Sequence, residues 1–248
     1  RARAYGVFGL LAMALLGKAA VAVAASLTAL PATAEMALVP ASSFLMGTSA
    51  AELDELVVSL QAHSPGRPIQ RTWFDDESPR REVSLAAFYM DKYEVTNAAY
   101  GAFLADSGHA PPAFWDDPRL NAPDYPVVGV SWDAAMAYAR WAGKSLPTEA
   151  QWELAARGGV AGSRYPWGSA WPPPDGSGNY GAGIADGFET TAPVGRFPGN
   201  AFGIHDLVGN VAEWCLDAYV EDYYAGAPDA DPVNRPPGGV RVLRVVRG

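Results

Sequence analysis

The chain has 248 residues, of which 49% are hydrophobic and 18% are charged, a composition that excludes a disordered chain and indicates a substantial core. Its formal net charge is −9 and its Lys and Arg residues form no basic stripe, so we expect no nucleic-acid partner. The 26 glycines, 21 prolines and 8 tryptophans predict long ordered loops anchored by aromatic side chains, with modest regular secondary structure.

Residues 1–34 have the features of a secretory signal peptide. Two arginines precede the apolar stretch 5–16, and the segment closes on Ala32, Thr33 and Ala34, so cleavage is expected after Ala34. Removal of this leader predicts a secreted or periplasmic protein with no stable membrane insertion. The apolar region is also long enough for an uncleaved membrane anchor, and this alternative stays open.

The elements expected first along the rest of the chain are strands and one short helix. Residues 36–47 predict two short strands around a turn at Pro40, and the polar segment 49–80 holds a possible helix at 51–60. Residues 81–90 begin with alternating apolar positions and then become continuously apolar, a pattern that predicts a strand entering the core.

Three helices with clear start and stop signals follow. A capping residue opens each of them and a glycine closes it, over the ranges Thr96–Gly108, Ser131–Gly143 and Thr148–Gly158. The third also carries a capping box, because Gln151 stands three residues after Thr148. No linker is evident after residue 80, so residues 35–248 are expected to form one domain.

Cysteine and histidine usage limits the chemistry that the chain can perform. Cys215 is the only cysteine, so no internal disulfide can form, and its apolar neighbours predict a small buried residue and not a reactive thiol. The histidines at 63, 109 and 205 lie far apart in the sequence without the spacing of zinc ligands. A histidine-based metal site is therefore not expected.

The segment from Asn200 to Trp214 is the most informative part of the chain. It places Asp206, Asn210 and Glu213 among glycines and apolar residues, with no Lys or Arg to pair with the acids. A buried carboxylate needs a partner, and calcium accepts carboxylate, amide and carbonyl oxygens. The alternative is that Asp206 caps the N-terminus of a helix. The segment by itself leaves both interpretations open.

Six segments of the chain resemble the formylglycine-generating enzyme family, also called sulfatase-modifying factors, and they occur in the order found in that family. They are Phe44–Gly47, Tyr93–Asn97, Pro126–Trp132, Trp141–Glu153, Arg164–Gly168 and Gly209–Trp214. The resemblance covers residues 36–248. It implies an α+β formylglycine-generating-enzyme fold, a single-domain variant of the C-type-lectin-like fold with low regular secondary-structure content.

The resemblance also implies two structural calcium ions. The ligands of the first are the side chains of Asn179 and Asp186 with the carbonyls of Tyr180 and Phe188. The ligands of the second are the side chains of Asp206 and Glu213 with the carbonyls of Gly209 and Val211.

Active members of this family resemble copper-dependent oxidases that use O2 to convert a cysteine in a Cys-x-Pro-x-Arg segment of a sulfatase into formylglycine. Their copper is held by two cysteine thiolates in a block that opens with Arg-Gly-Gly-Ser-Trp. Residues 244–248 match only the opening of that block, so we expect a domain truncated at its C-terminus. Copper is expected only if the full-length protein carries the cysteine pair beyond Gly248, and no catalytic residue is assigned here.

Two functions stay open on this sequence. The full-length protein is expected to be an exported oxidase of the formylglycine-generating type, with a sulfatase or another exported protein as its partner. The alternative is a non-catalytic, lectin-like module that binds protein or glycan through loops rich in Trp, Tyr and Gly. Residues 110–125 replace a longer Trp-rich insertion of the enzymes, with Trp115 as a remnant, and this difference disfavours sulfatase activation.

Overall fold

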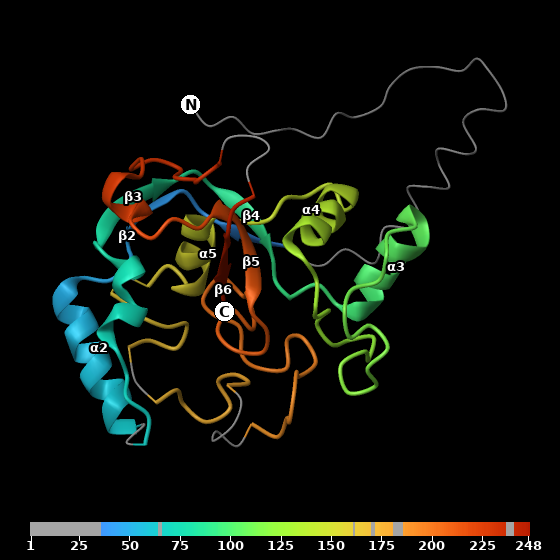
Figure 1. Ribbon diagram of the computed structural model, residues 1–248, viewed down its shortest axis with the longest axis horizontal. Helices are drawn as coiled ribbons and strands as arrows, with labels where there is room; N and C mark the ends of the chain where they lie inside the picture. The colour runs from blue at the N-terminus through green and yellow to red at the C-terminus, as the bar shows by residue number, and fades with distance from the viewer. Residues whose placement is uncertain (1–35, 64–65, 161, 170–171, 181–185, 237–240) are drawn as a thin grey trace, which may run out of the picture. The chain divides into compact units, whose positions relative to one another are not determined.

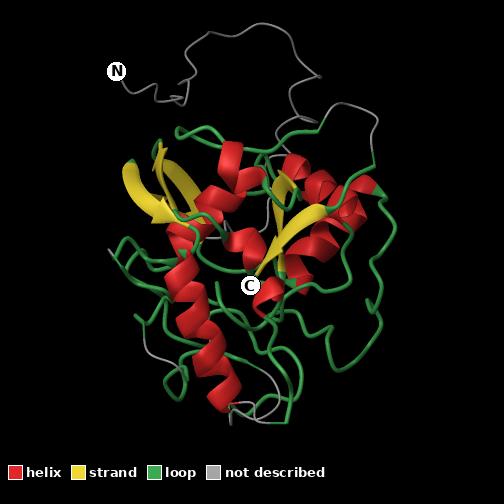
Figure 2. Cartoon of the chain, turned by 60° about the vertical axis from the view of Figure 1, so that its left-hand side comes forward, coloured by secondary structure: helices red, strands yellow, loops and turns green. Residues whose placement is uncertain are grey.

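Short strands and capped helices carry the regular structure in the part of the chain that the computed structural model describes, residues 36–63, 66–160, 162–169, 172–180, 186–236 and 241–248 (Figure 1). The predicted leader, residues 1–34, lies outside these ranges. Within them no helix is long and apolar enough to cross a membrane. Residues 34–248 form one unit, and loops make up much of it (Figure 2).

The strands form three antiparallel ribbons of two strands each. β1 (Met36–Val39) pairs with β4 (Phe88–Asp91), β2 (Ser42–Met46) pairs with β3 (Arg81–Leu85), and β5 (Glu213–Ala218) pairs with β6 (Arg244–Arg247). The two strands expected around Pro40 are confirmed. The single strand expected at 81–90 is wrong, because the ladder is interrupted where the backbone N–H of Ala86 donates to Asp231 Oδ1 at 2.9 Å.

The helices begin at the predicted capping residues. α3 (Asn97–Ser107), α4 (Trp132–Trp141) and α5 (Glu149–Ala156) are each capped by a hydroxyl that accepts a backbone N–H three residues on, and the capping box of α5 is present. α2 (Ala50–His63) is longer than expected. The remaining elements are the 3-10 turns η1 (Arg71–Trp73) and η2 (Asp75–Glu77) and the short helix α6 (Tyr223–Gly226).

Helix α5 lies at the centre of the hydrophobic core. Its residues Trp152, Leu154 and Ala155 are buried and pack with strand residues of all three ribbons, among them Val39 and Cys215. The predicted burial of Cys215 is confirmed, since its side chain is fully inaccessible. The core therefore fixes the position of the segment that leads into β5, which contains the predicted metal ligands.

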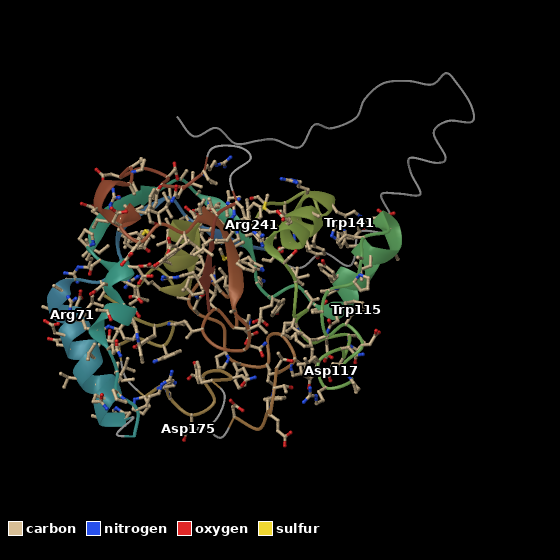
Figure 3. All side chains as sticks on the ribbon, viewed as in Figure 1. Arg71, Trp115, Asp117, Trp141, Asp175 and Arg241 are labelled. Atoms are coloured by element: carbon tan, nitrogen blue, oxygen red, sulfur yellow. The ribbon has the colours of Figure 1, made fainter. Side chains whose placement is uncertain are left out.

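A second cluster, of aromatic rings, joins α3 to α4. Tyr100 and Phe103 of α3 contact Tyr138 of α4, with ring centroids 5.5 and 5.7 Å from that of Tyr138. Trp115 packs on Tyr100 and Trp141 packs on Phe103, and Figure 3 shows both tryptophans beside α3. These two tryptophans therefore anchor a loop and a helix end inside the structure.

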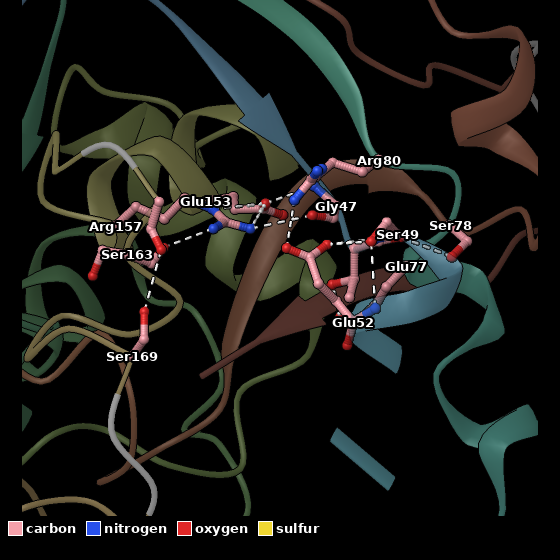
Figure 4. Close-up of polar contacts among 12 residues, drawn as sticks. Gly47, Ser49, Glu52, Glu77, Ser78, Arg80, Glu153, Arg157, Ser163 and Ser169 are labelled. Atoms are coloured by element: carbon pink, nitrogen blue, oxygen red, sulfur yellow. Dashed lines mark hydrogen bonds and ion pairs between the residues drawn. The ribbon is translucent and has the colours of Figure 1, made fainter. Parts of the chain in front are cut away.

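A buried ion network links α5 to Gly47 and to Arg247 of β6, and Figure 4 shows Gly47, Glu153 and Arg157 within it. Glu153 Oε1 accepts from the N–H of Gly47 and from Nη2 of Arg157, both at 2.8 Å. Its Oε2 accepts from Nη2 of Arg247 at 3.0 Å. Gly47 has φ +80°, and a Cβ there would lie 2.6 Å from the carbonyl oxygen of Glu77, so only glycine fits this turn.

The neighbouring Glu149 gives a pH-dependent prediction. Burial, which outweighs the attraction of Arg247, raises the pKa of Glu149 to about 7. The folded state therefore keeps a proton that the unfolded state loses near the ordinary carboxyl pKa of 4.5, so the free energy of unfolding falls as pH rises from about 4.5 to about 7. Glutamine does not titrate. Between about pH 5 and 8 we therefore expect the free energy of unfolding of Glu149→Gln to fall by roughly 2 kcal/mol less than that of the unsubstituted protein, measured by urea unfolding. Parallel pH profiles for the two proteins would contradict this assignment.

Candidate metal centre

The loop from Asn200 to Val211 is fixed in place by backbone contacts to neighbouring segments. Asn200 Nδ2 donates to the carbonyl of Ala155 in α5 at 2.6 Å, and the N–H of His205 donates to the carbonyl of Lys92 at 2.9 Å. No helix begins at Asp206 in this described segment, so the capping interpretation is wrong. Asp206 has φ +57°, and its Oδ2 accepts from the N–H of Gly195 at 2.6 Å.

Asp206 and Glu213 are close enough to interact electrostatically, and Glu94 joins them. Asn210 Nδ2 donates to Glu94 Oε2 at 2.6 Å, and Trp152 Nε1 donates to Glu213 Oε2 at 2.8 Å. Asp206 Oδ1 is buried and has no hydrogen-bond partner. We refer to Glu94, Asp206 and Glu213 as the acidic triad.

The surroundings of the acidic triad disfavour the simultaneous ionisation of its three carboxyl groups. Burial, followed by repulsion from Glu213 and Asp206, raises the pKa of Glu94 to about 9. Burial also raises the pKa of Glu213 to about 7, and it raises the pKa of Asp206. None of the ion pairs formed among the described residues includes a member of the triad. A bound cation would stabilise the ionised forms.

The residues of the predicted first site also lie close together. Asp186 Oδ2 accepts from the N–H of Tyr180 at 3.2 Å, and its Oδ1 accepts from the N–H of Phe188 at 2.9 Å. Asn179 adjoins the second site, because its carbonyl accepts from the N–H of Asn210 at 2.8 Å. Asp186 therefore acts here as a turn residue that binds backbone N–H groups, and residues 181–185 lie outside the described part.

Glycine lets the two predicted sites approach each other. Gly209 has φ +94°, and a Cβ at this position would lie 2.5 Å from the carbonyl oxygen of Asn179. Across the described ranges, no three His, Cys, Asp or Glu side chains converge closely enough to hold a metal by themselves. Calcium fits this donor set better than a transition metal does, because it also takes amide and carbonyl oxygens.

Sequence reasoning assigned no role to Glu94. The residue stands between Tyr93 and Val95, next to the cap of α3, and 116 residues separate it from Asn210. Its local signals were its place between two apolar residues and within the motif segment Tyr93–Asn97. Its proximity to the other two acids results from tertiary packing.

A cavity of about 470 Å³ lies beside the acidic triad, and its walls are mainly apolar. β4, α4, the segment 143–147 and the loop 204–214 all contribute to its lining, which includes Glu94 and Glu213. Tyr100 also lines the cavity, and its buried hydroxyl has no hydrogen-bond partner.

The residues present do not fit a two-thiolate copper site. The sequence contains a single cysteine, and Cys215 is fully buried in β5. Burial raises the pKa of its thiol well above the ordinary value, which disfavours the thiolate that would bind copper. No step of a copper-dependent reaction can therefore be assigned to these residues.

Residues 23–248 match the model of the sulfatase-modifying factor enzyme 1-like domain, the FGE-sulfatase family. The chain belongs to this family. A formylglycine-generating enzyme of Streptomyces coelicolor is 37% identical over 223 residues, which cover 68% of this chain and 70% of that relative. The family assignment made from the six segments is confirmed.

Another relative of this chain is named as inactive. The inactive C-alpha-formylglycine-generating enzyme 2 of Mus musculus is 32% identical, over 74% of this chain and 69% of that protein. Among solved structures, PvdO from Pseudomonas aeruginosa superposes with a TM-score of 0.67 at 29% identity, covering 86% of this chain and 80% of PvdO. The α+β formylglycine-generating-enzyme fold is confirmed, whereas its relation to C-type lectins stays a prediction.

Proposed function

We propose that this chain is the calcium-stabilised scaffold of an exported protein that oxidises a cysteine of a sulfatase, or of another exported protein, to formylglycine. Its 37% identity to a formylglycine-generating enzyme over two thirds of the chain carries this proposal. The catalytic cysteines would come from residues outside 1–248, because Cys215 is buried and is the only cysteine in the sequence. Those cysteines would bind the copper.

Calcium is proposed to hold the loops of the scaffold in place. The unpartnered Oδ1 of Asp206, buried beside Glu94 and Glu213, supports this proposal, since a cation would satisfy it. The ligands of the second ion would be the side chains of Asp206 and Glu213 with the carbonyls of Gly209 and Val211. The ligands of the first would be Asn179 and Asp186 with the carbonyls of Tyr180 and Phe188.

The enzymatic proposal is tested on the natural full-length polypeptide supplied with copper and O2. We expect it to convert the thiol of a Cys-x-Pro-x-Arg peptide to an aldehyde, detected by mass spectrometry and by reaction with a hydrazine probe. Cys215→Ser should leave the rate unchanged, since the thiol is inaccessible. No aldehyde at any copper concentration, in a folded full-length protein, would refute the oxidase activity.

A non-catalytic binding module is the second candidate. A relative named as inactive and the exposure of Trp73, Tyr89 and Phe114 on the surface support this candidate. Exposed aromatic rings can stack on sugars or pack on a partner protein. Binding to a glycan array that is lost in Trp73→Ala and Phe114→Ala, together with no aldehyde formation, would favour this function.

A further inference from the structure

The cavity of about 470 Å³ beside the acidic triad has the size and the walls of a small-molecule site. Pockets of roughly 300–1,000 Å³ with apolar walls and a few polar groups are typical ligand sites in proteins. Aliphatic side chains from three separate segments line this one, among them Val127, Val130, Leu146, Ile204 and Leu207. These walls favour a ligand with an apolar body, because the ligand removes their surface from water.

Three polar groups from different segments lie together on the cavity wall. Asp91 ends β4, Tyr138 lies in α4, and Lys144 follows that helix. Lys144 Nζ donates to both carboxylate oxygens of Asp91, at 2.6 and 2.8 Å, and Tyr138 is near enough to feel the charge of Asp91. The side chains of Lys144 and Asp91 are 29% and 24% exposed, so a ligand can reach the pair. We refer to these three residues as the polar cluster.

The polar cluster has unused hydrogen-bonding capacity. An ammonium group has three N–H donors, and Lys144 directs two hydrogen bonds to Asp91 and none to any other described residue. The Asp91 carboxylate can accept about four hydrogen bonds, and these two are the ones that described residues supply. Burial and then the charge of Asp91 raise the pKa of Tyr138 to about 12, so its hydroxyl remains a donor at neutral pH.

The other acids of the cavity wall already have partners. Glu94 accepts from Asn210 Nδ2 at 2.6 Å and from the N–H of Val211 at 3.3 Å. Glu213 accepts from Trp152 Nε1 at 2.8 Å. Both acids belong to the acidic triad, where we propose calcium. The polar cluster is therefore the part of the wall that can pair with the charge of a ligand.

An ion pair in the cavity wall selects the charge of the ligand. A head with one charge is attracted by Asp91 or by Lys144 and repelled by the other, so the two effects largely cancel. A head with both charges can lie antiparallel to the ion pair, and each of its charges then faces the opposite one. A free α-amino acid has such a head, because it carries an ammonium and a carboxylate on one carbon.

We propose that this cavity binds a free α-amino acid with a large apolar side chain. The ammonium of the ligand pairs with Asp91, and its carboxylate accepts from Lys144 Nζ and from the hydroxyl of Tyr138. The apolar side chain of the ligand occupies the aliphatic part of the cavity. This inference goes beyond the proposed function, since it requires neither copper nor a catalytic cysteine.

The test is isothermal titration calorimetry of the natural full-length polypeptide at constant calcium, with L-phenylalanine as the probe. N-acetyl-L-phenylalanine lacks the ammonium and L-phenylalaninamide lacks the carboxylate, so each should bind at least roughly 10-fold more weakly. Glycine, which lacks the apolar body, should also bind more weakly. Equal binding of either blocked form would overturn the proposal, as would the absence of saturable binding for L-phenylalanine, L-leucine and L-tryptophan alike.

Substitutions locate the binding site. Ala135 lines the cavity from α4, so Ala135→Phe should fill it and abolish binding while leaving the polar cluster unchanged. Asp91→Asn removes the charge that faces the ammonium and should weaken binding at least roughly 10-fold. The matched control is Asp133→Asn, an exposed aspartate of α4 outside the cavity lining, which should bind as the unsubstituted protein does.

The Tm of each variant separates lost binding from lost folding. Folded Ala135→Phe and Asp91→Asn proteins that both bind L-phenylalanine with unchanged affinity would overturn the proposal. If Asp91→Asn does not fold, the comparison of L-phenylalanine with its two blocked forms, together with Ala135→Phe, still decides it.

Discussion

Removing calcium with EDTA is expected to lower the free energy of unfolding by about 2.7 kcal/mol for each of the two ions, relative to protein at about 100 times the Kd for calcium. For a domain of this length, the loss of each ion corresponds to a fall of roughly 5–10 °C in Tm. The physical reason is that the acidic triad is buried without a pairing cation among the described residues, and one carboxylate oxygen has no partner. Differential scanning calorimetry with and without EDTA measures the effect.

Variants at the same site make the calcium prediction specific. Asp206→Ala and Glu213→Ala should each abolish the share of the calcium-dependent rise in Tm that the second ion contributes, whereas Asp206→Asn, which keeps an oxygen ligand, should retain part of that share. Asp175 is exposed on a loop, so Asp175→Ala should leave the rise unchanged. Magnesium should restore little stability, because it requires a smaller octahedral site.

Two outcomes would contradict the calcium assignment. One is a melting curve that is the same with EDTA and with excess calcium. The other is an effect below about 0.5 kcal/mol for Glu213→Ala in the presence of calcium, a value typical of a surface substitution.

Glu153→Ala is expected to destabilise the protein by about 3–5 kcal/mol, the usual cost of removing one partner of a buried ion pair. Glu153 is 4% exposed, and its loss leaves the guanidinium groups of Arg157 and Arg247 without their shared acceptor. The N–H of Gly47 loses its acceptor as well. Guanidinium chloride unfolding at constant calcium measures the change.

The exposed pair of Arg119 and Asp117 provides the control for this substitution. The side chain of Arg119 is 72% exposed, so Arg119→Ala should change stability by no more than about 1 kcal/mol. Glu153→Gln should lie between the two, since it keeps an acceptor for Gly47 but removes the charge. An effect of Glu153→Ala as small as that of Arg119→Ala would show that the network contributes little to stability.

The helices could be predicted from the sequence because their signals are local. Thr96, Ser131 and Thr148 each accept a hydrogen bond from an N–H only three residues further on, so the capping residue and its partner fall within one short segment. The six motif segments identified the family for a similar reason, since each one is contiguous. The burial of Cys215 also followed from its immediate neighbours.

Strand pairing was decided by tertiary structure. The two strands around Pro40 do not form a hairpin with each other, because β1 pairs with β4 and β2 pairs with β3. The alternation of buried residues along a strand indicates which face is inward but does not identify the partner strand. The break between β3 and β4 likewise depends on Asp231, far along the chain.

The sequence by itself determined the family, the capped helices and two acids of the candidate metal centre. Only the tertiary structure added Glu94 to Asp206 and Glu213, and only it formed beside them a cavity that residues of β4 and β5 help to line. Burial and mutual repulsion arise when distant segments pack together, and no local period in a sequence records them. The acidic triad is therefore a property of the folded chain.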